Sequence, residues 1–132
     1  MSRVLICHLI LLFGSAVVGA RIASAEVCPP FGEINAGIPR DYHSDGDPTY
    51  AATVSEWSHA EYSPHRERLF CHYTSSKRGD WSIYIIVGDI SDELRRSPTW
   101  VDGRIGAAWK EGPPFFVCFS KRYLCAFSVP GQ

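Results

Sequence analysis

The sequence predicts a small α+β domain, mainly antiparallel β, held together by disulfides and built on two hairpins with one or two short helices. Three observations predict this class. Residues 66–87 and 115–127 each contain two short runs rich in strand-forming residues, separated by a polar turn. The helical signals are only a few residues long. An export signal precedes four cysteines, and exported cysteines generally form disulfides.

The first 25 residues have the three parts of a secretory signal peptide. Arg3 gives a positive start, residues 4–18 are almost continuously apolar, and residues 23–25 read Ala-Ser-Ala. We expect cleavage after Ala25, which leaves residues 26–132 as a single exported globular domain in the periplasm or outside the cell. The apolar run is shorter than the roughly 20 residues of a membrane span, so no membrane span is expected.

The charge of the exported part argues against a nucleic-acid partner. Arg3 and Arg21 leave with the signal, so 11 basic residues remain against 14 acidic ones, and the net charge is −3. Nucleic-acid-binding domains generally carry a basic stripe, whereas the basic residues here come as separate pairs. We therefore expect no nucleic acid as partner, and another protein as the more natural one.

From residue 26 onward the chain alternates irregular segments and short elements. Residues 26–47 are rich in Pro and Gly, which favours an extended arm with turns. Residues 49–62 are ambiguous, with helical spacing favoured over a strand. The clearest hairpin pairs 66–74 with 81–87: Leu69, Cys71 and Tyr73 share one face, whereas Phe70 and His72 share the other.

The second half contains one short helix and the second expected hairpin. Residues 91–96 read as one or two helical turns, with Ser91 as N-cap. Residues 99–112 read as a loop holding a short strand. Residues 115–119 and 123–127 form the second hairpin around a turn at 120–122, which places Cys118 opposite Cys125.

The four cysteines of the exported part predict two disulfides. Cys118–Cys125 spans the second hairpin, and Cys28–Cys71 ties the N-terminal arm to a central strand. The rival pairing joins each cysteine of the C-terminal hairpin to one of Cys28 and Cys71. None of the four has the close spacing of a zinc site, and we expect no metal and no cofactor.

Histidines are the main candidates for chemistry, because imidazole exchanges protons near neutral pH. His59 with Glu61, or His65 with a glutamate two residues later, could pair with His72 across the fold. A small secreted hydrolase or nuclease that uses His59, His65 or His72 as general acid or base is built from such parts. They share no recognisable motif, so the sequence alone assigns no catalytic residue and leaves enzymatic activity open.

The aromatic residues suggest a different class of function. Trp100 and Trp109 lie in glycine-bearing, charged surroundings, where they are either core residues or anchors of an interface. A small exported non-enzymatic binding module, an inhibitor- or immunity-type protein-interaction domain, accounts for the small size and the disulfides. Convergence of the histidines in one cleft with a carboxylate favours the enzyme, and their scatter favours the binding module.

Overall fold

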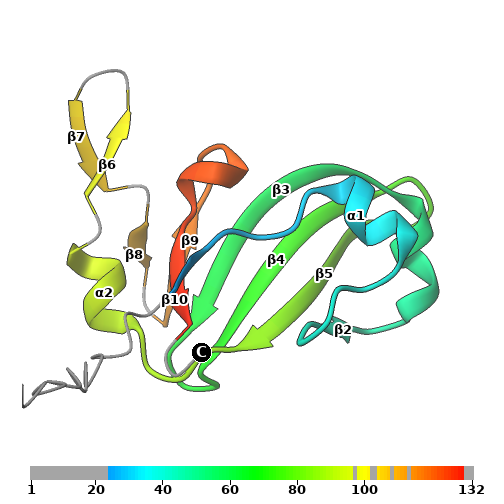
Figure 1. The fold of residues 1–132 in the computed structure, drawn as a ribbon, viewed down its shortest axis with the longest axis horizontal. Helices are drawn as coiled ribbons and strands as arrows, with labels where there is room; N and C mark the ends of the chain where they lie inside the picture. The colour runs from blue at the N-terminus through cyan, green and yellow to red at the C-terminus, as the bar shows by residue number, and fades with distance from the viewer. Residues whose placement is uncertain (1–23, 97, 102–103, 108, 113, 130–132) are drawn as a thin grey trace, which may run out of the picture.

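A six-stranded antiparallel sheet organises the chain (Figure 1). The computed structural model describes residues 24–96, 98–101, 104–107, 109–112 and 114–129. In spatial order the strands are β2 (His43–Asp45), β5 (Gly79–Ile86), β4 (Arg68–Ser75), β3 (Val54–Ser63), β9 (Phe115–Cys118) and β8 (Lys110–Gly112). Short helices and two disulfides complete the domain, which confirms the predicted α+β class.

The first predicted hairpin is confirmed as β4–β5. The register pairs Cys71 with Ile83 and Tyr73 with Trp81, so these apolar side chains share the buried face. Residues 76–78 form the turn, and Gly79 follows it with φ 86°, a backbone conformation that glycine adopts without steric cost. The two-residue periodicity was sufficient to predict this hairpin because one face of each strand is in the core.

The helix expected over residues 49–62 is wrong for most of its length. Only Pro48–Thr53 is helical, as the 3₁₀ helix η1, which begins after Asp47. The Asp47 side chain caps it by accepting hydrogen bonds from the backbone N–H and the hydroxyl of Thr49, at 2.9 and 2.8 Å. The rest becomes β3, because pairing with β4 on one side and β9 on the other outweighs a weak local preference.

The second predicted hairpin is also wrong. β9 pairs with β3 and β8 rather than with residues 123–127. Arg122–Leu124 form the 3₁₀ helix η2, and β10 (Phe127–Val129) pairs with β1 (Ser24–Glu26). β9 lies between β3 and β8 in the sheet, and the residues after it form a loop that the Cys118–Cys125 disulfide closes.

The short helix at Ser91–Arg96 is confirmed as α2, although a different residue caps it. Ser91 is the first helical residue, and its backbone N–H donates to the Asp89 carboxylate at 3.1 Å. Beyond it, β6 (Pro98–Val101) and β7 (Arg104–Ala107) form a separate two-stranded sheet where a loop with one short strand was expected.

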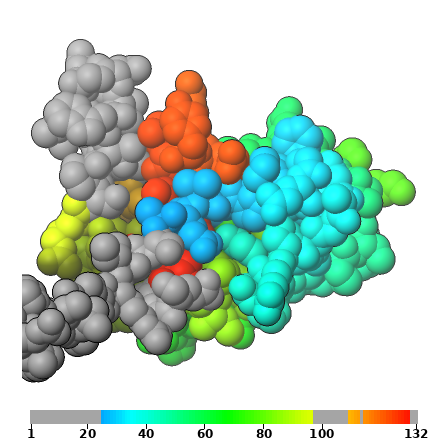
Figure 2. Space-filling view, viewed as in Figure 1, coloured from blue at the N-terminus to red at the C-terminus, as the bar shows by residue number. Residues whose placement is uncertain are grey.

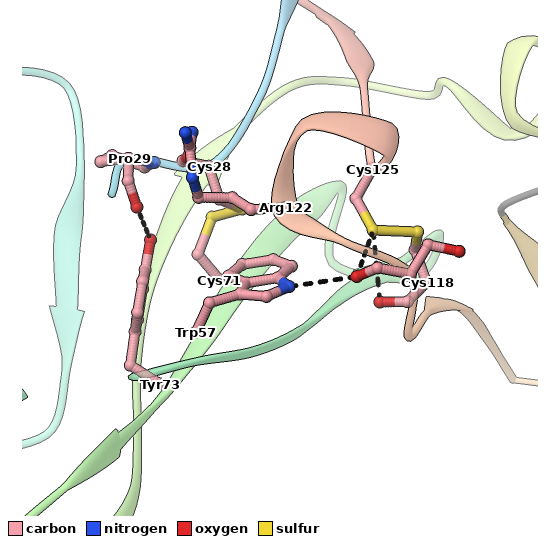
Figure 3. The surroundings of a disulfide bond; sticks show 9 residues. Cys28, Pro29, Trp57, Cys71, Tyr73, Cys118, Arg122 and Cys125 are labelled. Atoms are coloured by element: carbon pink, nitrogen blue, oxygen red, sulfur yellow. Dashed lines mark hydrogen bonds between the residues drawn. A yellow bond between two sulfur atoms is a disulfide. The ribbon is translucent and has the colours of Figure 1, made fainter. Parts of the chain in front are cut away.

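The N-terminal arm crosses one face of the large sheet and is tied to it (Figure 3). The predicted pairing is confirmed, with Cys28–Cys71 in the arm and Cys118–Cys125 near the C-terminus. The Tyr73 hydroxyl donates to the Pro29 carbonyl, and Arg122 donates to the Cys28 carbonyl at 2.7 Å. The arm also contains a six-residue helix, α1 (Phe31–Ala36), which its glycine and proline content did not predict.

The core lies between the sheet and this arm. Ile34 of α1 is fully buried against the sheet, in one cluster with Tyr62, Tyr73 and Ile83. Figure 2 shows the same side of the molecule, where the arm in blue and the α1–η1 region in cyan cover the strands. Because neighbouring side chains on a strand point to opposite faces, the residues between the core residues lie on the other side of the sheet.

The export signal lies outside the described residues, apart from its last two. β1 includes Ser24 and Ala25, which precede the predicted cleavage site, and Glu26, which follows it. Within the described part of the chain, no helix has the length and apolar character needed to cross a membrane.

Candidate functional site

The face of the sheet opposite the arm carries two rows of side chains. We call it the histidine face. Residues that pair directly in neighbouring antiparallel strands lie on the same face. The first row is Asp45, Ser82, His72 and His59, and the second is His43, Tyr84, Phe70, Glu61 and Val117. The first row carries two histidines on adjacent strands, with Glu61 on the same strand as His59.

A β-bulge in β3 turns His59 toward this face. Trp57 pairs with Tyr73 on the core side, yet His59, two residues later, pairs with His72, only one residue back along β4. Ser58 is therefore the extra residue of the bulged strand. In a regular strand without this bulge, His59 would lie on the same face as Trp57, because side chains two apart share a face.

His59, Glu61 and His72 meet at the centre of the histidine face, and we call them the histidine–glutamate cluster. The two imidazole rings are stacked, with centroids 4.2 Å apart and planes only 7° from parallel. One possible ligand atom from each of the three side chains lies within 4.8 Å of the other two. Each member is half-buried.

In both imidazoles, a hydrogen bond at Nδ1 fixes the orientation of the ring. His59 Nδ1 is hydrogen-bonded to the Ser58 hydroxyl at 2.8 Å, and His72 Nδ1 donates to the Asp80 carboxylate, 3.3 Å from each oxygen. His72 Nε2 is buried and has no hydrogen-bond partner among the residues that the structure describes. Burial lowers the pKa of His59, and the adjacent His72 lowers it further, which favours the neutral imidazole.

A cavity of about 410 Å³ adjoins the cluster. Its lining combines ionisable and aromatic side chains: Asp45, Glu61, Ser63, His65, Arg66, Phe70, His72, Pro114 and Phe115. His65 and Arg66 come from the turn between β3 and β4, where the Arg66 backbone N–H donates to the Ser63 hydroxyl at 3.4 Å. The cavity therefore has two carboxylates and one imidazole from the sheet, and a second imidazole and a cation from the turn.

The structure brings together most of the histidine candidates. His59, Glu61 and His72 form the cluster, and His65 lines the same cavity as Glu61 and His72. Glu67, the alternative partner of His65, is not among the cavity residues. His59, His65 and His72 are therefore not scattered over the molecule but lie at or beside one cavity.

The tryptophans offer less support for an interface. Trp109 is only 3% exposed, belongs to the core cluster and donates from Nε1 to the Ala126 carbonyl at 2.8 Å. The core alternative therefore describes Trp109, and a direct interface role for it is not supported. Trp100 lies in β6, but its side chain is outside the described residues.

Several residues of the site escaped the sequence analysis. Ser58 and Asp80 orient the imidazoles, while Asp45 and Arg66 line the cavity. The expected β4–β5 hairpin could have predicted that Asp80 lies near His72. Asp80 pairs with Thr74, which is two residues from His72 and shares its face. The other three depend on a bulge, a turn and a strand pairing that no local pattern specifies.

Comparisons with known proteins do not identify the chain: no protein family, no curated protein and no solved structure matches it.

Proposed function

We propose that the chain is a small exported hydrolase that acts in the cavity of the histidine face. The observation that carries this proposal is the convergence of two histidines and a glutamate beside a cavity of about 410 Å³. General acid–base catalysis needs titratable groups within reach of one another and of a bound substrate. Convergence with a carboxylate is also the arrangement that distinguishes this class from a binding module.

The histidine–glutamate cluster would activate the attacking water. Glu61 and His72 are the members that line the cavity, and a carboxylate or a neutral imidazole can accept a proton. The water oxygen bonds to the electrophilic carbon of the substrate, and the water proton passes to the cluster. The bond from that carbon to the leaving oxygen breaks, and the leaving oxygen takes up a proton, so the products are an acid and an alcohol.

The rest of the cavity favours a carbonyl ester over a phosphodiester. The Asp45 and Glu61 carboxylates both line it, and two negative groups repel an anionic phosphate. Arg66 supplies a cation for the oxygen that becomes negative in the transition state, and His65 can protonate the leaving oxygen. Phe70 and Phe115 provide apolar walls for the substrate.

The test uses the exported chain with p-nitrophenyl acetate and bis-p-nitrophenyl phosphate. We expect saturable hydrolysis of the acetate, faster than that of the phosphate, and a loss of at least about tenfold in kcat/KM for Glu61→Gln. His43→Gln is the matched control, since His43 stacks on Tyr84 on the same face but outside the cavity.

This control matters because any accessible histidine cleaves p-nitrophenyl acetate slowly. Hydrolysis that does not saturate, or that His43→Gln and Glu61→Gln reduce equally, contradicts the proposal.

A binding module remains the second candidate, favoured by two aromatic side chains next to the cluster. Phe119 is 74% exposed, with its ring 5.0 Å from that of His59, and Phe115 is 36% exposed at the cavity. Exposed aromatic residues are frequent anchors of protein interfaces. This candidate predicts that a protein co-purifying from the native compartment is lost with Phe119→Ala and retained with Tyr123→Ala, an exposed aromatic residue of η2.

A further inference from the structure

We infer that His59, Glu61 and His72 together bind one divalent transition-metal ion, with zinc the best match. The inference deepens the proposed function: the catalytic role of the ion rests on that function, whereas its binding is measurable without turnover. The cysteine spacing predicts no zinc site, and all four described cysteines are in disulfides.

The donor set has the composition of a catalytic zinc site. Two imidazole nitrogens and one carboxylate oxygen lie within 4.8 Å of one another. Catalytic zinc sites commonly use three protein ligands, two histidines and a glutamate among them, and keep a fourth position for water or substrate. Because imidazole also suits copper and nickel, the chemistry points to this group of ions rather than to calcium or magnesium.

The hydrogen bonds on the two rings prepare them for the same role. Metal-binding histidines usually hydrogen-bond through the other ring nitrogen to a carboxylate or another polar group, which fixes the ring orientation. Here Asp80 holds Nδ1 of His72 and Ser58 holds Nδ1 of His59. With Nδ1 of His59 donating to the Ser58 hydroxyl and Nδ1 of His72 donating to Asp80, Nε2 is in both rings the nitrogen available to an ion.

His72 Nε2 supplies an independent observation. This atom is buried and has no hydrogen-bond partner in the described part of the chain. A buried polar atom without a partner costs about 1–3 kcal/mol, so native proteins rarely leave one unsatisfied. Coordination of a metal by this nitrogen satisfies it without any new side chain.

Ion binding requires the two rings to turn relative to each other. Nitrogens bound to one tetrahedral zinc at about 2.0–2.1 Å lie roughly 3.4 Å from each other. The imidazole centroids are 4.2 Å apart and the planes nearly parallel, so the ring edges must tilt toward each other. His59 is adjacent to the bulge in β3, where strand geometry is already irregular.

An ion in this position would border the cavity, because Glu61 and His72 line it. Bound zinc lowers the pKa of a coordinated water to about 7, which produces hydroxide at neutral pH. The cluster would then deliver the nucleophile of the proposed hydrolysis. His65 and Arg66 do not belong to the donor set and keep the roles assigned to them.

The test is titration of untagged, chelator-treated protein with ZnCl₂ in a calorimeter, together with CoCl₂ as a spectroscopic probe of coordination. We expect one ion per chain and visible absorption bands typical of low-coordinate cobalt. Glu61→Gln and His59→Gln should each weaken binding at least about tenfold, and Asp80→Asn, which removes the carboxylate behind His72, about tenfold.

His43→Gln is again the control and should bind zinc as the unmodified protein does. A ring nitrogen of His72 is buried, so a variant at this position could be unfolded. Glu61→Gln and His59→Gln, checked for an unchanged melting curve without metal, therefore carry the test. Absence of binding, or binding that persists in both variants, overturns the inference.

Turnover measured in parallel separates the two proposals. Zinc binding without hydrolysis supports the metal site and contradicts the hydrolase. Hydrolysis that a chelator leaves unchanged, in protein that binds no zinc, supports acid–base catalysis and contradicts the metal site.

Discussion

Removal of the Cys28–Cys71 disulfide should destabilise the chain more than removal of Cys118–Cys125. The first pair lies 43 residues apart in the sequence and the second only 7. A disulfide acts largely by restricting the unfolded chain, and the effect grows with the length of the loop that it closes. The double variant Cys28→Ala/Cys71→Ala is therefore the informative perturbation.

The magnitude follows from the two loop lengths. On the chain-entropy relation, the long loop contributes about 4 kcal/mol and the short loop about 2.5 kcal/mol. Domains of this size have a total stability of only about 5–15 kcal/mol. At about 4–8 °C per kcal/mol, we expect the melting temperature to fall by roughly 15–30 °C for the long loop.

Urea unfolding at 25 °C, followed by tryptophan fluorescence, measures both double variants under the same conditions. In the native state the arm also keeps its hydrogen bond from Tyr73 to Pro29, drawn in Figure 3, and the one from Arg122 to Cys28. A smaller loss for Cys28→Ala/Cys71→Ala than for Cys118→Ala/Cys125→Ala would refute the loop-length reasoning.

Three further predictions concern a helix cap, a core residue and the N-terminus. Hydrogen bonds from Thr49 lower the pKa of the Asp47 carboxyl below its usual value. The ionised carboxylate therefore stabilises the fold at neutral pH, and this stabilisation is lost as the pH falls through the lowered pKa. Asp47→Ala should remove this part of the acid dependence in melting curves measured at several pH values. Trp109→Phe should cost about 1–3 kcal/mol in urea unfolding, since it leaves the Ala126 carbonyl without its donor, and a neutral result would contradict the core assignment. N-terminal sequencing of exported protein should begin at Glu26, and a sequence that starts earlier would contradict the predicted cleavage.

The predicted cleavage site also bears on the fold. β1 pairs Ser24, Ala25 and Glu26 with β10, so cleavage after Ala25 would leave only the Glu26–Phe127 pair of this ladder. The remaining anchor of the arm would then be the Cys28–Cys71 disulfide together with the hydrogen bonds around it. This is a second reason to expect a large effect from its removal.

The β4–β5 hairpin shows what a local pattern can determine. Leu69, Cys71 and Tyr73 occupy every second position and share one face, and a strand with one face in the core has only one register that buries them all. Both cysteine pairs were also predictable, although Cys118–Cys125 was predicted from a hairpin that does not form. Its 7-residue separation permits closure by a loop as readily as by paired strands.

The site itself depended on tertiary structure. The sequence shows His59, Glu61 and His72 as possible partners, since residues two apart on a strand share a face. Whether His59 lies on the core face or on the histidine face was decided by the bulge at Ser58, which exists only because β3 pairs with β4 in that register. The cavity likewise needed Phe115, which β9 brings beside β3 across about 50 intervening residues, a long-range pairing that no short segment of sequence specifies.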